Sequence, residues 1–587
     1  MIFNLFQRPE RAHLEMYNFQ REIAHRLGLK VTIFVRANTL NDPELMELCR
    51  RDHEQYGDEV GLWLVGDGKN GSGFIWLNTT EDKERCVRSS IEAFSRCFGY
   101  PPTVVGAYVL DADLIRIIKE CSPGVTACVA GCFEEGVKVF HGCNNSWYLF
   151  SEGMPWAPWY PSKGHSVRPA ANQEDWSGVV AVPHLCRDLV FAYESRNDFF
   201  ASHPANIQRG LANDGAIHEY DFNLCDQYRL QEDYNDGFSY YQVHVSSGWL
   251  SHNFNIIDPD EITQQLYVET LEYIKSLCDE GKAVSLTFSE FAEQYKQCVP
   301  IGKQTVALAK DILMGSGKQY YWVCGTDYRA LVDTFQGGSI GDLRPYAGRY
   351  DAITGPDAPN GRYLMNTYPY LIQSQYRSGY KHHCFDGSRT TLFATHAGER
   401  LDLCAYNTRV ESVTRTENSS ELTLAPVTLE FEDGLTVTLQ TVYRFLPDGK
   451  IGITRRILSM SDPAADLTFC EYVKGCYGFT EYPEDMKGIR LYADGEPVID
   501  YCYKRQARVT EGGRRVAAVI PEITTEFSLE ADTPATATEI AEGELFDPYY
   551  VMKLYYTVTD KTKEVNSWLQ IKKTAASSTV ARSASTR

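Results

Sequence analysis

Two carboxylates, Asp111 and Asp113, lie at the junction between an apolar stretch and the predicted helix ADLIRIIKE. The stretch TVVGAYVL, residues 103–110, is typical of a strand buried on both faces. Barrels of parallel strands carry their catalytic groups at the carboxyl ends of those strands. Asp111 is the first side chain beyond the stretch, so we expect it to face a pocket. Asp113 is expected to cap the helix, although either acid could do so.

Three further acids follow strands of the same kind. Glu10 comes after the first strand, and Glu134 and Glu135 come after the fifth. The two later acids could form a solvated turn, and alternation along an extended chain lets only one of them point inward. Glu10 stands near Arg8 and Arg11 and could be a structural ion-pair partner. An arginine neighbour also favours an ionised carboxylate, which suits a nucleophile or an acceptor of hydroxyl groups.

Strand-like and helix-like segments alternate over the first 300 residues, which predicts a parallel sheet covered on both faces. About seven or eight strands favour a closed, irregular (β/α)7 or (β/α)8 barrel over an open sheet. After about residue 375, apolar and polar residues alternate between Asp-Gly turns, which predicts an antiparallel β-sandwich. The expected regions are a barrel at 1–300, a mixed bridging segment at 301–375, a β-sandwich at 376–572 and a disordered tail at 573–587.

The composition limits the class of partner. The net charge is -21, from 57 Lys plus Arg and 78 Asp plus Glu, and such a surface repels nucleic acid and anionic membranes. No apolar run is long enough to span a membrane, and the N-terminal stretch lacks the pattern of a signal peptide. The 17 scattered cysteines include no CxxC pair and are typical of reduced thiols. We expect a cytoplasmic protein with a neutral ligand, and a homodimer remains one option.

The order of these segments resembles glycoside hydrolase families 38 and 57 and the related NodB-type polysaccharide deacetylases. REIAHRLGLKVTIFV, residues 21–35, resembles the deacetylase phrase in which a helix runs into a strand. DEVGLWL, residues 58–64, and GAYVLDADLIRIIKE, residues 106–120, stand where those proteins carry their HEIGxH phrase and their fourth strand with its helix. The second half resembles the galactose-mutarotase-like sandwich that follows some of these barrels. The resemblance implies an irregular (β/α)7 barrel that acts on carbohydrate.

The metal-binding motifs of these families are absent from the matching positions. The first strand ends in Gln7-Arg8-Pro9-Glu10 without paired aspartates, and the third ends in Leu64 without histidine. The resemblance therefore implies an enzyme without a metal or other cofactor that uses its own carboxylates. Glycosidic cleavage commonly needs two, about 5 to 5.5 Å apart in retaining enzymes and about 6.5 to 9.5 Å apart in inverting ones. The expected catalytic residues are Asp111, Glu135, Glu134 and Glu10.

Several other side chains stand where a sugar could bind. The segment at residues 144–165 is rich in tryptophan, tyrosine and proline, and a long loop after a barrel strand is often functional. Its rings could stack on sugars or form a satellite core, and a single histidine is more often a structural hydrogen-bonding group than a catalyst. The expected substrate-binding residues are Arg8, Asp113, Trp147, Tyr148, Trp159, Tyr160, His184, His244 and Trp249.

These features favour a glycoside hydrolase that cleaves an oligosaccharide or glycoside by a two-carboxylate mechanism. A second possibility is a metal-dependent, deacetylase-like sugar hydrolase that uses His184, His218 or His244. A third is a carbohydrate-binding protein without turnover. Metal analysis separates the first two, and a panel of glycosides separates the first from the third.

Overall fold

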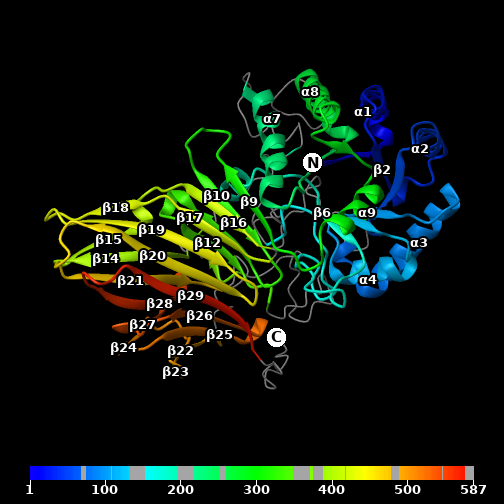
Figure 1. Ribbon diagram of the computed structural model, residues 1–587. Helices are drawn as coiled ribbons and strands as arrows, with labels where there is room; N and C mark the ends of the chain where they lie inside the picture. Colours follow the sequence, from blue (N-terminus) through cyan, green and yellow to red (C-terminus); the bar gives the residue numbers. More distant parts are fainter. Residues whose placement is uncertain are drawn as a thin grey trace. The chain divides into compact units, whose positions relative to one another are not determined.

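The computed structural model describes residues 1–67, 75–107, 109–131, 153–195, 202, 216–251, 260–347, 370–374, 388–416, 418–477, 488–544 and 547–574. The chain forms two compact units, drawn in Figure 1. The first unit comprises Met1–Gly317 and Asp351–Thr367. The second comprises Lys318–Tyr350 and Tyr368–Arg587. The expected tail lies almost entirely outside the described residues. No helix among the described residues is long and apolar enough to cross a membrane.

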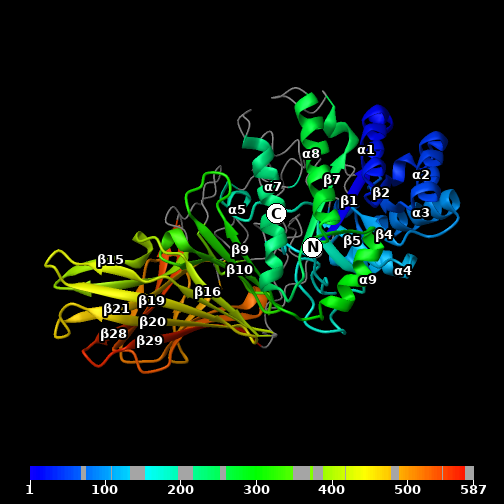
Figure 2. The same cartoon turned by 45° about the horizontal axis from the view of Figure 1, so that its top comes forward.

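Strands and helices alternate along the first unit. Its strands are β1 (Ile2–Arg8), β2 (Val31–Arg36), β3 (Glu59–Trp63), β4 (Val104–Gly106), β5 (Ala127–Gly131), β6 (Val180–Pro183), β7 (Tyr240–Ser246), β8 (Val284–Ser285) and β9 (Thr305–Lys310). Its helices are α1 (Leu14–Leu27), α2 (Pro43–Tyr56), α3 (Thr80–Phe98), α4 (Ala112–Cys121), α5 (Phe191–Ser195), α7 (Ala216–Arg229), α8 (Asp260–Asp279) and α9 (Phe288–Cys298). Figure 2 shows α1, α2 and α3 along one side of the parallel strands.

The helix ends follow the local sequence signals. The Asp42 carboxylate accepts a hydrogen bond from the backbone amide of Leu45, and Pro43 occupies the first position of α2. The helix ends at Gly57, whose φ of 75° lies in the left-handed region. These are the preferred start and stop of an α-helix, so α2 has the bounds that its sequence predicts.

The parallel sheet is open rather than closed. Its strand order is β6-β5-β4-β3-β2-β1-β7, with β8 paired to β1, so β6 and β7 form the two ends among the described strands. The outer edge of β6 pairs with a single residue, Trp159, and not with another strand. The backbones of Trp159 and Ala181 form two hydrogen bonds, of 3.0 and 2.9 Å. The expectation of a closed barrel is therefore wrong for the described strands.

A side chain nevertheless connects the two end strands. Gln242 of β7 donates a hydrogen bond from Nε2 to the carbonyl oxygen of Pro183 in β6. The Gln242 amide oxygen in turn accepts a hydrogen bond of 2.7 Å from the Tyr240 hydroxyl. The sheet is therefore curled far enough for its ends to approach, and the first unit is a partial barrel.

The second unit is built from antiparallel strands. They are β10 (Gln319–Cys324), β11 (Arg329–Asp333), β12 (Ser339–Arg344), β13 (Ile372–Gln373), β14 (Arg389–His396), β15 (Glu399–Asp402), β16 (Val410–Arg415), β17 (Ser420–Leu424), β18 (Val427–Glu430), β19 (Thr436–Phe445), β20 (Lys450–Met460), β21 (Leu467–Gly475), β22 (Arg490–Ala493), β23 (Glu496–Asp500), β24 (Ala507–Glu511), β25 (Arg515–Ile520), β26 (Thr525–Ala531), β27 (Ala537–Glu544), β28 (Asp547–Val558) and β29 (Glu564–Lys573).

Two large sheets form the β-sandwich that the alternating pattern predicts. One has the order β15-β14-β21-β28-β27-β24, and the other runs from β16 through β19, β20 and β29 to β23. The buried guanidinium of Arg455 on β20 donates hydrogen bonds of 3.0 and 2.7 Å to the carboxylate of Glu471 on β21, which joins the two sheets. Both side chains are almost completely buried, so this ion pair lies in the core of the sandwich.

Candidate functional site at the carboxyl ends of the parallel strands

Glu10 lies just beyond the carboxyl end of β1 and is surrounded by groups from three neighbouring strands. Its Oε1 is 3.8 Å from Nη2 of Arg8 on β1 and 3.6 Å from Nη2 of Arg36 on β2. The hydroxyl of Ser246, at the end of β7, donates a hydrogen bond of 3.2 Å to the same oxygen. The Glu10 side chain is 19% exposed, so this carboxylate is held in place and still reaches the surface.

The Arg8 side chain lies over the ring of Trp63, and that ring packs against Gly106. The centre of the Arg8 guanidinium is 5.0 Å from the centroid of the Trp63 ring, which is a cation–π contact, and both side chains are buried. Trp63 lies against Gly106 of β4, where an added Cβ would come within 2.4 Å of the ring. The glycine in VVGAYVL therefore allows the indole to lie across β4.

His184 and His244 come together although 60 residues separate them in the sequence. Their ring centroids are 4.2 Å apart at an interplanar angle of 71°, and both side chains are fully buried. The ring of Trp63 lies 5.5 Å from that of His244. Sequence reasoning found each histidine separately. It missed their contact because that contact depends on the curling of the sheet, which brings the ends of β6 and β7 together.

Asp111 has a different environment from the one expected. It is the N-cap of α4 and accepts a hydrogen bond of 2.8 Å from the backbone amide of Leu114. Its other oxygen is 2.8 Å from Nζ of Lys83 on α3, and both side chains are almost fully buried. β4 ends at Gly106, several residues earlier than the sequence predicts, so Asp111 does not directly follow the strand.

The expectation that Asp113 caps α4 is wrong. Asp113 lies inside the first turn of the helix. Its carboxylate is 2.6 Å from Nη2 of Arg116 and accepts a hydrogen bond of 3.2 Å from the Thr80 hydroxyl. A capping residue needs an extended backbone before the first turn, and Asp111 has it, with φ of -75° and ψ of 171°.

The described part of the aromatic segment is packed into the first unit. Trp159 and Tyr160 are 3% and 5% exposed. The Trp159 indole donates to the Ser166 carbonyl at 2.8 Å, and the Tyr160 hydroxyl donates to the Val299 carbonyl at 2.7 Å. This environment is that of a satellite core. The predicted site residues Glu134, Glu135, Trp147 and Tyr148 and the side chains of His218 and Trp249 lie outside the described residues.

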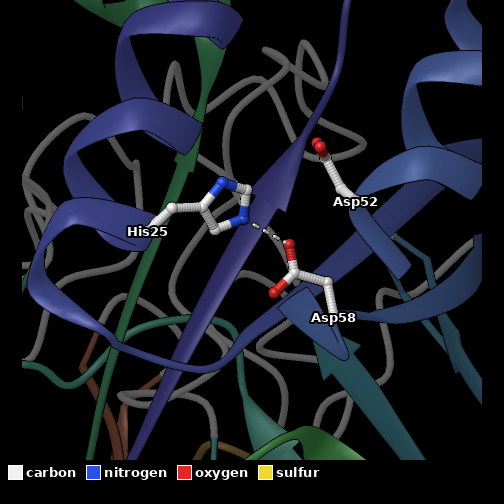
Figure 3. A group of neighbouring side chains, drawn as sticks. All are labelled: His25, Asp52 and Asp58. Atoms are coloured by element: carbon white, nitrogen blue, oxygen red, sulfur yellow. Dashed lines mark hydrogen bonds and ion pairs between the residues drawn. The ribbon is translucent and has the colours of Figure 1, made fainter. Parts of the chain in front are cut away.

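One group in the described part of the chain has donor atoms close enough to be considered for a metal: His25, Asp52 and Asp58, drawn in Figure 3. It lies near the amino end of β3, away from Glu10. His25 Nε2 is 2.8 Å from Asp58 Oδ2, and Arg21 contacts both oxygens of Asp52. A guanidinium bound to two carboxylate oxygens competes with a metal for those oxygens. We interpret this group as an ion-pair network that joins α1, α2 and β3.

Within the part of the chain that the structure describes, His184 and His244 do not belong to such a group. Among the described residues, no cysteine, aspartate, glutamate or further histidine completes a set of three close donor atoms with them. Their neighbours include the rings of Phe6, Phe34 and Trp63. The described residues therefore do not fit the histidine and aspartate set of a metal-dependent deacetylase.

Comparison with known families gives one match. Residues 28–313 match the model of a family described as "Domain of Unknown Function with solved-structure structure (DUF3863)". The match covers most of the first unit and just under half of the chain. No curated protein matches the chain.

Several solved structures resemble parts of the chain. One, from Parabacteroides distasonis, has been suggested to be a glycoside hydrolase/deacetylase; it has 15% identity and a TM-score of 0.48 and covers 62% of this chain and 90% of its own. A 4-alpha-glucanotransferase from Thermococcus litoralis has 11% identity and a TM-score of 0.29, with 97% and 99% coverage. A galactose mutarotase-like protein from Clostridium acetobutylicum has 8% identity and a TM-score of 0.31, with 45% and 98% coverage.

The similar structures include the same classes that the sequence layout resembles, namely the glycoside hydrolase/deacetylase class and the mutarotase-like class. At these identities and TM-scores, the likeness establishes no shared activity.

Proposed function

We propose that the first unit is a carbohydrate-active hydrolase, most specifically a glycoside hydrolase, and that its reaction takes place at the carboxyl ends of β1, β2 and β7. The observation that carries the proposal is the position of Glu10. This carboxylate is partly exposed and lies beside two arginines and the hydroxyl of Ser246. Such a carboxylate can act as a nucleophile, as a base or as an acceptor for sugar hydroxyl groups.

Glu10 is a better candidate for direct chemistry than Asp111. Asp111 is fully buried, and its two oxygens are engaged by Lys83 and by the first turn of α4. A carboxylate held in this way stabilises the fold, and moving it toward a substrate would leave the Lys83 ammonium without its buried partner. The sequence-based assignment of Asp111 as a catalytic acid remains a prediction, but it is no longer the first to test.

A second carboxyl group is needed to protonate the leaving group. Glu134 or Glu135, after β5, remains the proposed acid on sequence grounds. The distance between this acid and Glu10 would decide the stereochemistry, with about 5 to 5.5 Å for retention and about 6.5 to 9.5 Å for inversion. No metal or other cofactor takes part in this proposal.

The test is hydrolysis of a panel of aryl glycosides by the full chain and by Glu10→Gln. Loss of one catalytic carboxylate is expected to lower kcat by roughly a hundred- to ten-thousandfold, because a positioned acid or base contributes about that much. Glu44→Gln is the matched control. Glu44 pairs with Arg11 at 2.6 Å and is 69% exposed, so this variant makes the same chemical change on the surface and should keep full activity.

Two outcomes would contradict the proposal. One is near-wild-type turnover by Glu10→Gln on a glycoside that the parent protein cleaves. The other is that the parent protein cleaves no glycoside and instead releases acetate from acetylated sugars with a dependence on added metal.

A further inference from the structure

Asp221 is a buried carboxyl group between two helices of the first unit. It lies on α7, is 1% exposed and faces Thr270 of α8. Its Oδ2 is within hydrogen-bonding distance of the Thr270 hydroxyl, and its Oδ1 has no hydrogen-bonding partner among the described residues. A buried carboxylate oxygen without a donor is costly, so this group requires a physical explanation.

The hydrogen-bond count at Thr270 favours a protonated acid. The Thr270 hydroxyl also lies 2.7 Å from the backbone carbonyl oxygen of Leu266, one turn earlier on α8. A hydroxyl has one proton to donate, so it cannot donate to an ionised Asp221 and to Leu266 together. If Asp221 carries a proton on Oδ2, it donates to Thr270, and Thr270 donates to Leu266. Both contacts are then hydrogen bonds.

The groups around Asp221 do not compensate a negative charge. The ionisable groups that interact electrostatically with it are Tyr220 and Cys225 on its own helix and Tyr241 on β7. Burial raises the pKa of all three well above the usual values, so they are neutral near pH 7. Burial also raises the pKa of Asp221 to about 7, opposed by the hydrogen bond with Thr270, and no lysine, arginine or histidine in the described part of the chain contributes.

We propose that Asp221 is a neutral carboxylic acid that joins α7 to α8 through Thr270, and that its ionisation loosens this contact as the pH rises through neutrality. α7 is thereby a pH-sensitive element of the first unit. This inference is independent of the proposed hydrolase activity, because Asp221 lies between two helices and touches none of the residues grouped around Glu10.

The size of the effect follows from the two protonation states. If local opening of α7 returns Asp221 to its ordinary pKa of about 3.9, Asp221 alone should raise the opening equilibrium about tenfold between pH 6 and pH 8. Hydrogen exchange of the peptides covering residues 216–229, corrected for intrinsic exchange rates, measures this change in the full-length protein.

Asp221→Asn separates the proposal from a merely structural role. Its amide can donate to Thr270 as the neutral acid does, so protection of α7 should lose most of its pH dependence. Asp188 accepts a hydrogen bond of 2.8 Å from Tyr220 of α7, and burial raises the pKa of Asp188 to about 6. In Asp221→Asn, the opening equilibrium of α7 should therefore still rise about twofold between pH 6 and pH 8. Asp226→Asn is the control, because Asp226 is on the same helix and pairs with Arg229 near the surface.

A second measurement keeps the test decisive if Asp221→Asn folds poorly. The infrared difference spectrum of the wild-type protein between pH 6 and pH 8 should contain the carbonyl band of a protonated carboxylic acid, and Thr270→Val should shift that band. An absent band at pH 6, or α7 protection that changes equally in wild type and Asp221→Asn, would overturn the proposal.

Discussion

Three carboxyl groups of the first unit have different environments. Glu10 is partly exposed and lies beside the guanidinium groups of Arg8 and Arg36, whereas Asp111 is paired with Lys83 in the interior. Asp221 contacts the Thr270 hydroxyl, and no cationic group in the described part of the chain contributes to its pKa. The same functional group can therefore serve as a site carboxylate, a structural ion-pair partner or a neutral hydrogen-bond donor. Local desolvation and the nearest charges decide which of these roles it takes.

The buried pair of Asp111 and Lys83 leads to a prediction about stability. Asp111→Asn can still cap α4, but it leaves the Lys83 ammonium buried without a counter-charge. Removal of one member of a buried ion pair typically costs about 3–5 kcal/mol. We therefore expect a loss of that order in the free energy of unfolding of the first unit, measured by chemical denaturation.

The double variant Asp111→Asn/Lys83→Met tests the reason for that loss. It removes both charges and should recover most of the lost stability, because the uncompensated ammonium is gone. If Asp111→Asn alone is as stable as the parent and only turnover falls, the structural role of Asp111 is wrong and its catalytic assignment is favoured again.

At the scale of elements, the sequence predicts the alternation of strands and helices along the first unit. The apolar stretch at residues 31–35 becomes β2 (Val31–Arg36), and α2 has its capping aspartate and terminal glycine in the expected places. These features depend on local propensity and burial, which a sequence pattern carries directly. TVVGAYVL is less well predicted, because an apolar run does not reveal where hydrogen bonding to neighbouring strands stops.

The candidate site is harder to predict than the elements that carry it. Glu10 and Arg8 can be recognised as candidate site residues from the sequence, because Arg8 ends β1 and Glu10 follows it closely. Arg36 and Ser246 approach Glu10 only because of the register between strands. Lys83 approaches Asp111 only because of the packing of α3 against α4. The prediction of a closed barrel is wrong for a related reason. Trp159, a residue outside the strands, pairs with the edge of β6, and the sequence pattern does not indicate this pairing.

The contact between β3 and β4 can be tested at Gly106. An added methyl group would lie 2.4 Å from the Trp63 ring, so Gly106→Ala forces the indole or the strand to move. Overpacking of this kind typically costs about 1–3 kcal/mol, which should appear as a lower midpoint of denaturation. Gly124→Ala is the control, because no atom lies within 4 Å of an added Cβ there.

A compensating change identifies the cause. Gly106→Ala combined with Trp63→Phe should be more stable than Gly106→Ala alone, since the smaller ring leaves space for the methyl group. If the second substitution makes the protein still less stable, the steric contact with Trp63 is not what requires glycine at this position.

At the scale of the whole molecule, each unit has its own buried core and its own buried ion pair. Asp111 and Lys83 belong to the first unit, and Arg455 and Glu471 belong to the second. Larger proteins with separate domains commonly depart from two-state unfolding. We therefore expect two cooperative transitions in scanning calorimetry, one for each unit.

Matched substitutions assign these two transitions. Glu471→Gln leaves the Arg455 guanidinium in the sandwich core without its counter-charge, and we expect a cost of about 3–5 kcal/mol there. Glu471→Gln should lower the midpoint temperature of the second unit's transition and leave that of the first unit unchanged. Asp111→Asn should lower the midpoint temperature of the first unit's transition and leave that of the second unit unchanged. If each substitution lowers both transitions together, the units do not unfold independently. The division at Lys318 would then describe the geometry of the chain and not its thermodynamics.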